Sequence, residues 1–156
     1  MLTFYQAYLD RLEDLHKDLA QAIGGLPQAA LDWTPSEGMN SINILITHLT
    51  GAERYWIGDV AAGDVAAGNP PRDRAAEFRV SGITLDALRQ RLDDTLAYAR
   101  RALESLTLRD LEQARTSPPN GRILSVSWAL LHALEHTAIH LGHIQLTRQL
   151  WEKSGH

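Results

Sequence analysis

The sequence predicts an all-α protein that folds as a four-helix bundle, and three observations support this prediction. Four stretches of roughly 20 residues each place apolar side chains at helical spacing, and glycines and prolines separate them. No segment shows a convincing strand pattern, because residues 78–80 form too short a run. Amphipathic helices of similar length can bury their apolar faces against one another in a bundle.

The first two predicted helices have clear boundaries. The first covers residues 5–23 and ends before Gly24, Gly25 and Pro27, which are residues that stop helices. The second begins at residues 40–41, where a serine is a good N-cap, and continues to about Trp56.

The third and fourth predicted helices cover residues 85–106 and 124–153. Arginines and aspartates on the polar side of the third are typical of a solvated face. The connection between the second and third helices, residues 61–83, is long and contains three glycines and two prolines. Because it could cross the bundle, a simple up-down-up-down topology is not assured, and it could also cover a site.

The bulk properties favour one soluble domain spanning residues 1–156. The formal net charge of −4 gives no basic footprint, so we expect no nucleic-acid partner. No run of about 18 apolar residues could span a membrane, and residues 1–4 lead directly into an amphipathic pattern rather than a signal peptide. We therefore expect a cytoplasmic protein.

The chain contains no cysteine. This excludes disulfides, cysteine nucleophiles and thiolate metal ligands. A metal ion would have to be held by histidine or carboxylate, and a thiol in the chemistry would have to arrive on a substrate.

A stripe of histidines marks the fourth predicted helix: His132, His136, His140 and His143 fall within about 80° on a helical wheel. The helix is apolar over most of its surface, so we expect it to be buried on most sides. Buried imidazoles need partners, and a metal ion would satisfy several of them at once.

Three histidines form the candidate metal site. His136 and His140 are four residues apart and can reach one ion, and His48 lies on the apolar stripe of the second helix. Three imidazoles would leave open coordination positions on the metal, as in catalytic rather than structural metal sites. Spacing alone does not separate such ligands from hydrogen-bonded core histidines, which are the alternative.

A di-iron centre is a competing hypothesis that the sequence does not favour. Such centres need paired Glu-x-x-His motifs, and this chain has one, formed by Glu13 and His16 in a polar neighbourhood. We interpret His16 and His156 as surface residues. Gly142, in mid-helix, is most simply explained by close approach of another helix, and Trp33 and Trp56 by core packing rather than by the mouth of a site.

The chain resembles the DinB/YfiT-like superfamily of small metal-binding four-helix bundles over most of its length. Residues 31–35, 41–42 and 47–49, followed by Glu53 and Trp56, are similar to the second-helix region of that family. Residues 128–144 are similar to its fourth-helix signature, and the most specific part is the histidine pair followed by Gly142 and Ile144.

The resemblance implies a site and an activity. In this superfamily one histidine of the second helix and the pair on the fourth hold a divalent metal, here His48, His136 and His140. Zn²⁺ or Ni²⁺ fits such ligands, and the sequence does not identify the metal. His132 and His143 are candidates for supporting the ligands or contacting the substrate, and no catalytic residue is assigned.

Characterised members of the superfamily include S-transferases and isomerases that use low-molecular-weight thiols such as bacillithiol or mycothiol. We therefore expect a metal-dependent enzyme that activates such a thiol, in the manner of an S-transferase, for stress response or detoxification. One alternative is a hydrolase of a small substrate, with His132, His143 or Glu53 as its base. Another is a non-catalytic metal-binding bundle. Relatives are commonly homodimers, and apolar surface on the first or third helix could support one here.

Overall fold

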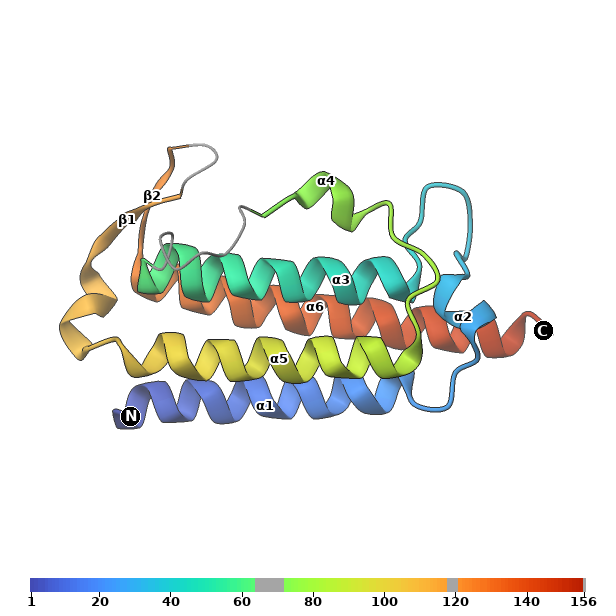
Figure 1. The fold of residues 1–156 in the computed structure, drawn as a ribbon, viewed down its shortest axis with the longest axis horizontal. Helices are drawn as coiled ribbons and strands as arrows, with labels where there is room; N and C mark the ends of the chain where they lie inside the picture. The colour runs from blue at the N-terminus through green and yellow to red at the C-terminus, as the bar shows by residue number, and fades with distance from the viewer. Residues whose placement is uncertain (64–71, 118–120, 156) are drawn as a thin grey trace.

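The computed structural model describes residues 1–63, 72–117 and 121–155 and shows four long helices packed side by side (Figure 1). They are α1 (Thr3–Ile23), α3 (Ile42–Glu53), α5 (Leu85–Glu104) and α6 (Val126–Lys153). A π-helical segment, η1 (Arg54–Ala62), continues α3. The predicted four-helix bundle, with its long connection between the second and third long helices, is confirmed.

The helices do not follow one another around the bundle. Both α5 and α6 pack against α1 and against α3, so α1 and α3 occupy one diagonal and α5 and α6 the other. The chain therefore crosses the bundle between α1 and α3 and again between α5 and α6. The sequence left this topology open, because the apolar stripe of a helix shows which face is buried but not which helix it packs against.

Short elements complete the fold: α2 (Gln28–Asp32), α4 (Arg74–Glu77), a 3₁₀ turn η2 (Leu108–Glu112), β1 (Ala114–Thr116) and β2 (Ile123–Ser125). The two strands pair antiparallel and lead directly into α6. Sequence analysis predicted no strand, because three residues are too few to display an alternating pattern.

Side-chain caps set several helix boundaries. The Ser41 hydroxyl accepts a hydrogen bond from the Ile44 amide, as the sequence predicted, and the Ser125 hydroxyl does the same for the Trp128 amide at the start of α6. At the C-terminal end of α1, the Arg148 guanidinium donates hydrogen bonds to the carbonyls of Ala22 and Gly24. These carbonyls would otherwise lack helical partners.

The hydrophobic core forms two clusters along the bundle, and a buried polar layer lies between them. In this layer His16 Nε2 lies 2.9 Å from Glu53 Oε2, and Thr137 donates to Glu53 Oε1 at 2.6 Å. His16 is 5% exposed and Glu53 1%. Burial acts to lower the pKa of His16, but the Glu53 carboxylate outweighs it and raises this pKa.

The interpretation of His16 as a surface residue was therefore wrong. His16 lies on the inner stripe of α1 with Leu12 and Leu19, four residues after one and three before the other. Its charged sequence neighbours conceal this position. His156 lies outside the described residues.

The outer surface of α6 is unusually apolar. Leu131, Ile139, Leu146 and Leu150 are all exposed, whereas the described part of α5 exposes no large apolar side chain. Gly142 faces open space, because a Cβ built there would meet no atom within 4 Å. The expected close helix approach at Gly142 is wrong. Of the two helices suggested to carry exposed apolar surface, the described residues of α5 expose no large apolar side chain, whereas α1 exposes Phe4.

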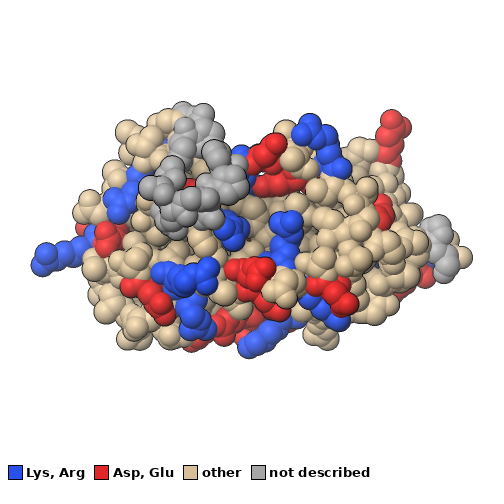
Figure 2. Space-filling view, in the orientation of Figure 1, with Lys and Arg blue, Asp and Glu red and all other residues tan. Residues whose placement is uncertain are grey.

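Charged side chains are mixed on the face shown in Figure 2, where lysines and arginines alternate with acidic residues. This face has no basic patch of the kind that binds nucleic acid. No helix in the described ranges is both long and apolar enough to cross a membrane.

Candidate metal centre

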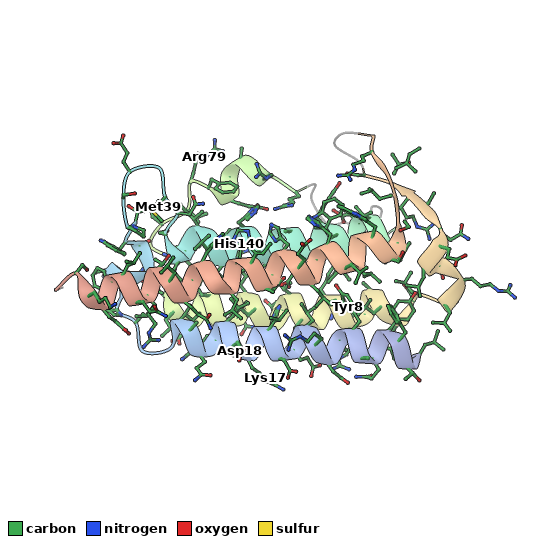
Figure 3. The ribbon with its side chains drawn as sticks, turned by 180° about the vertical axis from the view of Figure 1, so that it is seen from behind. Tyr8, Lys17, Asp18, Met39, Arg79 and His140 are labelled. Carbon is green, nitrogen blue, oxygen red and sulfur yellow. The ribbon has the colours of Figure 1, made fainter. Side chains whose placement is uncertain are left out.

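The helices α3 and α6 run antiparallel side by side (Figure 1). His48 on α3 meets His136 and His140 on α6, and Figure 3 labels His140. The ring centre of His48 lies 5.0 Å from that of His136 and 5.1 Å from that of His140, and the last two are 4.4 Å apart. One nitrogen from each ring lies within 4.8 Å of the others. The structure thus brings together the three residues that the sequence selected, and their binding of a metal stays a prediction.

The donor geometry fits a cation. The Nε2 atoms of His136 and His140 are 3.2 Å apart. Zn–N bonds of about 2.0–2.1 Å place two tetrahedral ligand nitrogens about 3.3–3.4 Å apart. Without an ion this pair can share only one proton, and the buried Nδ1 atoms of both rings have no hydrogen-bond partner among the described residues.

Both α6 rings are neutral at physiological pH. Burial, followed by the positive charge that His140, His48, His132 and Arg72 can carry, lowers the pKa of His136 to about 3. Burial and the neighbouring His48 and His143 lower the pKa of His140 to about 4. Neutral imidazoles keep the lone pairs that a metal needs.

A carboxylate orients His48. Glu77, on α4, lies 2.9 Å from His48 Nδ1, and Arg72 holds the same carboxylate through Nε at 2.6 Å and Nη2 at 2.8 Å. Burial would raise the pKa of Glu77, but the hydrogen bonds from Arg72 and His48 hold it below its usual value. Arg72 Nη2 also lies 3.2 Å from His48 Nδ1. Because an ionised carboxylate can only accept, we assign the Nδ1 proton to the contact with Glu77, which leaves the Nε2 lone pair for a metal.

Gly51 makes this contact possible. It lies one turn after His48 on α3, and a Cβ there would overlap the Glu77 carboxylate. Phe78, next to Glu77, covers the His48 ring at 4.7 Å between centres. Residues 72–78 of the long connection thus pack over His48, and the sequence analysis allowed that this connection could cover a site.

Sequence analysis missed Arg72 and Glu77. They belong to a short helix and its approach, where no periodic pattern assigns a side chain to any helix face. Gly51, three residues after His48 in a helix, was the available signal, because a mid-helix glycine often marks a close approach.

His132 and His143 flank the cluster on α6. The His132 ring stacks on Trp128, contacts Trp56 edge-on at 4.9 Å and lies 5.9 Å from the His136 ring. The His143 ring lies 5.5 Å from that of His140 and is exposed. Trp56 therefore borders the histidine stripe, whereas Trp33 packs against Trp151 at the far end of α6.

Glu53, a candidate base, does not reach the open side of the cluster. It is 1% exposed, and its two oxygens are engaged by His16 and Thr137. His132 and His143 are the remaining candidates from the sequence.

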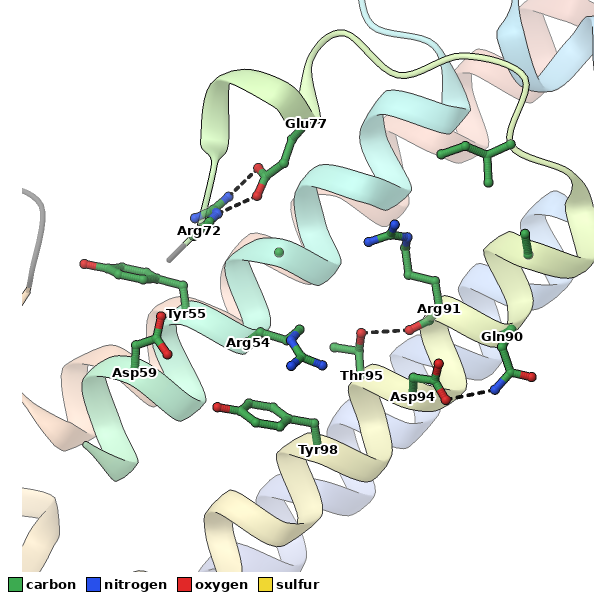
Figure 4. Close-up of a pocket in the computed structure, with 13 residues that line it drawn as sticks. Arg54, Tyr55, Asp59, Arg72, Glu77, Gln90, Arg91, Asp94, Thr95 and Tyr98 are labelled. Carbon is green, nitrogen blue, oxygen red and sulfur yellow. Dashed lines mark hydrogen bonds and ion pairs between the residues drawn. The ribbon is translucent and has the colours of Figure 1, made fainter. Parts of the chain in front are cut away.

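Two cavities lie near the cluster. One of about 670 Å³ lies between η1 and α5; charged side chains line it, and the Arg72–Glu77 pair forms part of its wall (Figure 4). The second, of about 200 Å³, lies between α6 and the start of α3 and includes His143. The three clustered histidines line neither, so the donor set rather than cavity size identifies the candidate site.

The arrangement can hold one divalent ion and leave positions for exogenous ligands. Three imidazoles supply three of the four to six ligands that such ions take. A thiol or a water molecule could occupy the remainder.

Comparison with known proteins identifies a family with a related description. The family model described as Mycothiol-S-transferase matches residues 7–153. A search of curated proteins found no match to this sequence.

Solved structures share the fold. A conserved protein from Enterococcus faecalis superposes with a TM-score of 0.76 at 14% identity, covering 96% of this chain and 98% of that one. YfiT from Bacillus subtilis, described as a probable metal-dependent hydrolase with an unusual four-helix bundle topology, gives 0.75 at 16% identity, with 96% and 89% covered. A mycothiol-dependent maleylpyruvate isomerase gives 0.63 at 17%, covering 91% of this chain and 62% of that one.

Proposed function

The chain belongs to the mycothiol-S-transferase family, and from this membership we propose that it is a divalent-metal-dependent transferase joining a low-molecular-weight thiol to a small electrophile. The observation that carries the proposal is the cluster of His48, His136 and His140, whose neutral rings and converging nitrogens suit a metal. We assign these three residues as the ligands of one ion, with Zn²⁺ or Ni²⁺ the preferred occupants.

When bound, the ion would lower the pKa of a thiol or water ligand and make it nucleophilic at neutral pH. The protein's own residues would do the rest. Glu77 would fix the His48 ring with Nε2 facing the ion, and Phe78 would cover that ring from solvent.

The transfer itself balances simply. The sulfur forms a bond to the electrophilic carbon, the leaving group departs with the electron pair of the broken bond, and the thiol proton goes to solvent. His132 and His143 are the imidazoles beside the cluster that could accept this proton on its way.

Hydrolysis is the second candidate, because YfiT of Bacillus subtilis is described as a probable metal-dependent hydrolase. It would use the same three ligands with water as the nucleophile and His132 or His143 as the base. A third possibility is a bundle that binds metal without turnover. Activity that requires added thiol separates the first candidate from both others.

The biological setting is part of the proposal. We infer a single-domain cytoplasmic protein in stress response or detoxification, with small-molecule partners and no direct nucleic-acid or membrane partner. We also infer a homodimer, for which the exposed apolar face of α6 around Leu131 and Ile139 offers surface.

Elemental analysis combined with thiol-transfer assays tests the proposal. About one metal per chain in the parent protein, lost in His48→Ala, His136→Ala and His140→Ala and retained in His132→Ala, is the expected result. The parent should consume mycothiol with an electrophile such as monochlorobimane, and the three ligand variants should not. Metal content unchanged in His136→Ala would refute the assigned site.

A further inference from the structure

We propose that the 200 Å³ cavity beside His143 is the binding site for the apolar part of the electrophile. This inference deepens the proposed function and rests on it. The cavity lies between the C-terminal half of α6 and the first turn of α3, and residues 39–40 complete its lining.

The cavity lies one helical turn from the histidine cluster. On α3, Leu45 lines the cavity and precedes His48 by three residues, which is an axial distance of about 4.5 Å. On α6, His143 lines the cavity and follows His140 by three residues. Figure 3 shows Met39 displaced from His140 toward the C-terminal end of α6. A molecule in the cavity could thus place a reactive carbon near the cluster.

The lining selects apolar groups. Met39, Leu45, Leu146 and Leu150 supply most of it, and no aspartate, glutamate, lysine or arginine contributes. Met39 is 45% exposed, Leu146 50% and Leu150 37%. Large apolar side chains gathered around one concave site are typical of a binding pocket. Charged side chains line the 670 Å³ cavity, in contrast, so it does not offer this environment.

The volume sets the size of the ligand. At about 30 Å³ per water-sized group, the cavity holds roughly seven carbon atoms. The His143 ring lines this apolar space and lies 5.5 Å from the His140 ring, so it can contact the end of the molecule nearest the cluster. The predicted substrates are therefore small electrophiles with an uncharged alkyl or aryl part of about this size.

Binding of 1-alkanols to the 156-residue chain tests the cavity without requiring turnover. In NMR titrations from 1-butanol to 1-nonanol, affinity should rise about three- to fourfold per methylene and level off near seven carbons. The shifted resonances should include those of Leu146 and Leu150. Absence of chain-length dependence, or shifts confined to other parts of the protein, overturns the proposal.

Two matched variants sharpen the test. Leu146→Trp fills the cavity and should weaken 1-heptanol binding at least tenfold, whereas Leu108→Trp, at an exposed leucine of η2 outside the cavity, should leave it unchanged. In thiol transfer to 1-iodohexane, Leu146→Trp should raise the KM for the iodoalkane and leave the KM for the thiol unchanged. Equal losses in both variants contradict the assignment.

The outcomes separate this proposal from the proposed function. His136→Ala should lose metal yet bind 1-heptanol as the parent does. Metal and thiol transfer without alkanol binding would leave the function standing and refute the cavity. Unchanged alkanol binding in Leu146→Trp, together with a change in molecular mass by light scattering, would identify these leucines as a protein interface and overturn the proposal.

Discussion

At the scale of single residues, Glu77 is predicted to tune the metal affinity of the candidate site without being one of its ligands. It is the hydrogen-bond partner of His48 Nδ1 and is itself held by Arg72. Glu77→Gln preserves the shape of the side chain but removes the negative charge that makes His48 Nε2 a more basic metal ligand. We predict a 10- to 100-fold loss of Zn²⁺ affinity, measured by competition with a chromophoric chelator. Glu37→Gln, at an exposed position, is the control, and equal affinities in the two variants would contradict the role of Glu77.

The buried pair of His16 and Glu53 predicts a pH dependence of stability. The pKa of His16 is raised in the folded protein above the value of about 6.5 in unfolded chains. Its contribution is therefore complete below about pH 6.5 and is lost as the pH rises through the folded pKa.

His16→Ala should accordingly cost about 3–5 kcal/mol at pH 6, because it leaves Glu53 buried without its partner, and less at pH 9. Urea unfolding of chelator-treated protein from pH 6 to 9 measures this. Lys17→Ala, on the exposed side of α1, should behave as the parent does. A His16→Ala penalty that does not change with pH would show that the ion pair is not the cause.

At the scale of elements, two glycines in long helices should respond oppositely to alanine. Gly51→Ala places a methyl group where the Glu77 carboxylate lies, so α4 must shift and Zn²⁺ affinity should fall about tenfold. Gly142→Ala meets open space and should stabilise the protein by about 0.5–1 kcal/mol through helix propensity, with unchanged affinity. Chelator competition and urea unfolding measure both effects, and a stable, fully binding Gly51→Ala would contradict the close contact.

Helices and strands could be predicted from the sequence only where a periodic apolar pattern was long enough to recognise. The four long helices were predictable because apolar residues recur at 3.6-residue spacing, over three turns in α3 and five or more in α1, α5 and α6. The hairpin of β1 and β2 and the π-helical geometry of η1 were not, because three-residue strands and a change of helical register leave no such pattern. His48, His136 and His140 could be selected because helical spacing shows which side chains share a face and the family resemblance marks the same three positions, whereas Arg72 and Glu77 depend on how a connection returns to the bundle.

For the whole molecule, metal binding should appear as thermal stability, because an ion that binds only the folded state stabilises it by mass action. At a free concentration 100 times Kd the gain is about 2.7 kcal/mol, which corresponds to roughly 5–10 °C in Tm for a chain of this length. EDTA should lower the Tm of the parent by this amount and leave that of His136→Ala unchanged. An equal shift in both proteins would place the responsible ion elsewhere.

The Arg72–Glu77–His48 contact joins a segment outside the four long helices to a candidate ligand within them. Occupancy of the cluster should therefore be transmitted to the backbone around α4. Trypsin cleaves after arginine, and Arg74 and Arg79 lie on either side of Glu77. If cleavage at these two bonds is slower in the metal-loaded protein, the pattern of tryptic fragments on a gel would report whether the site is filled.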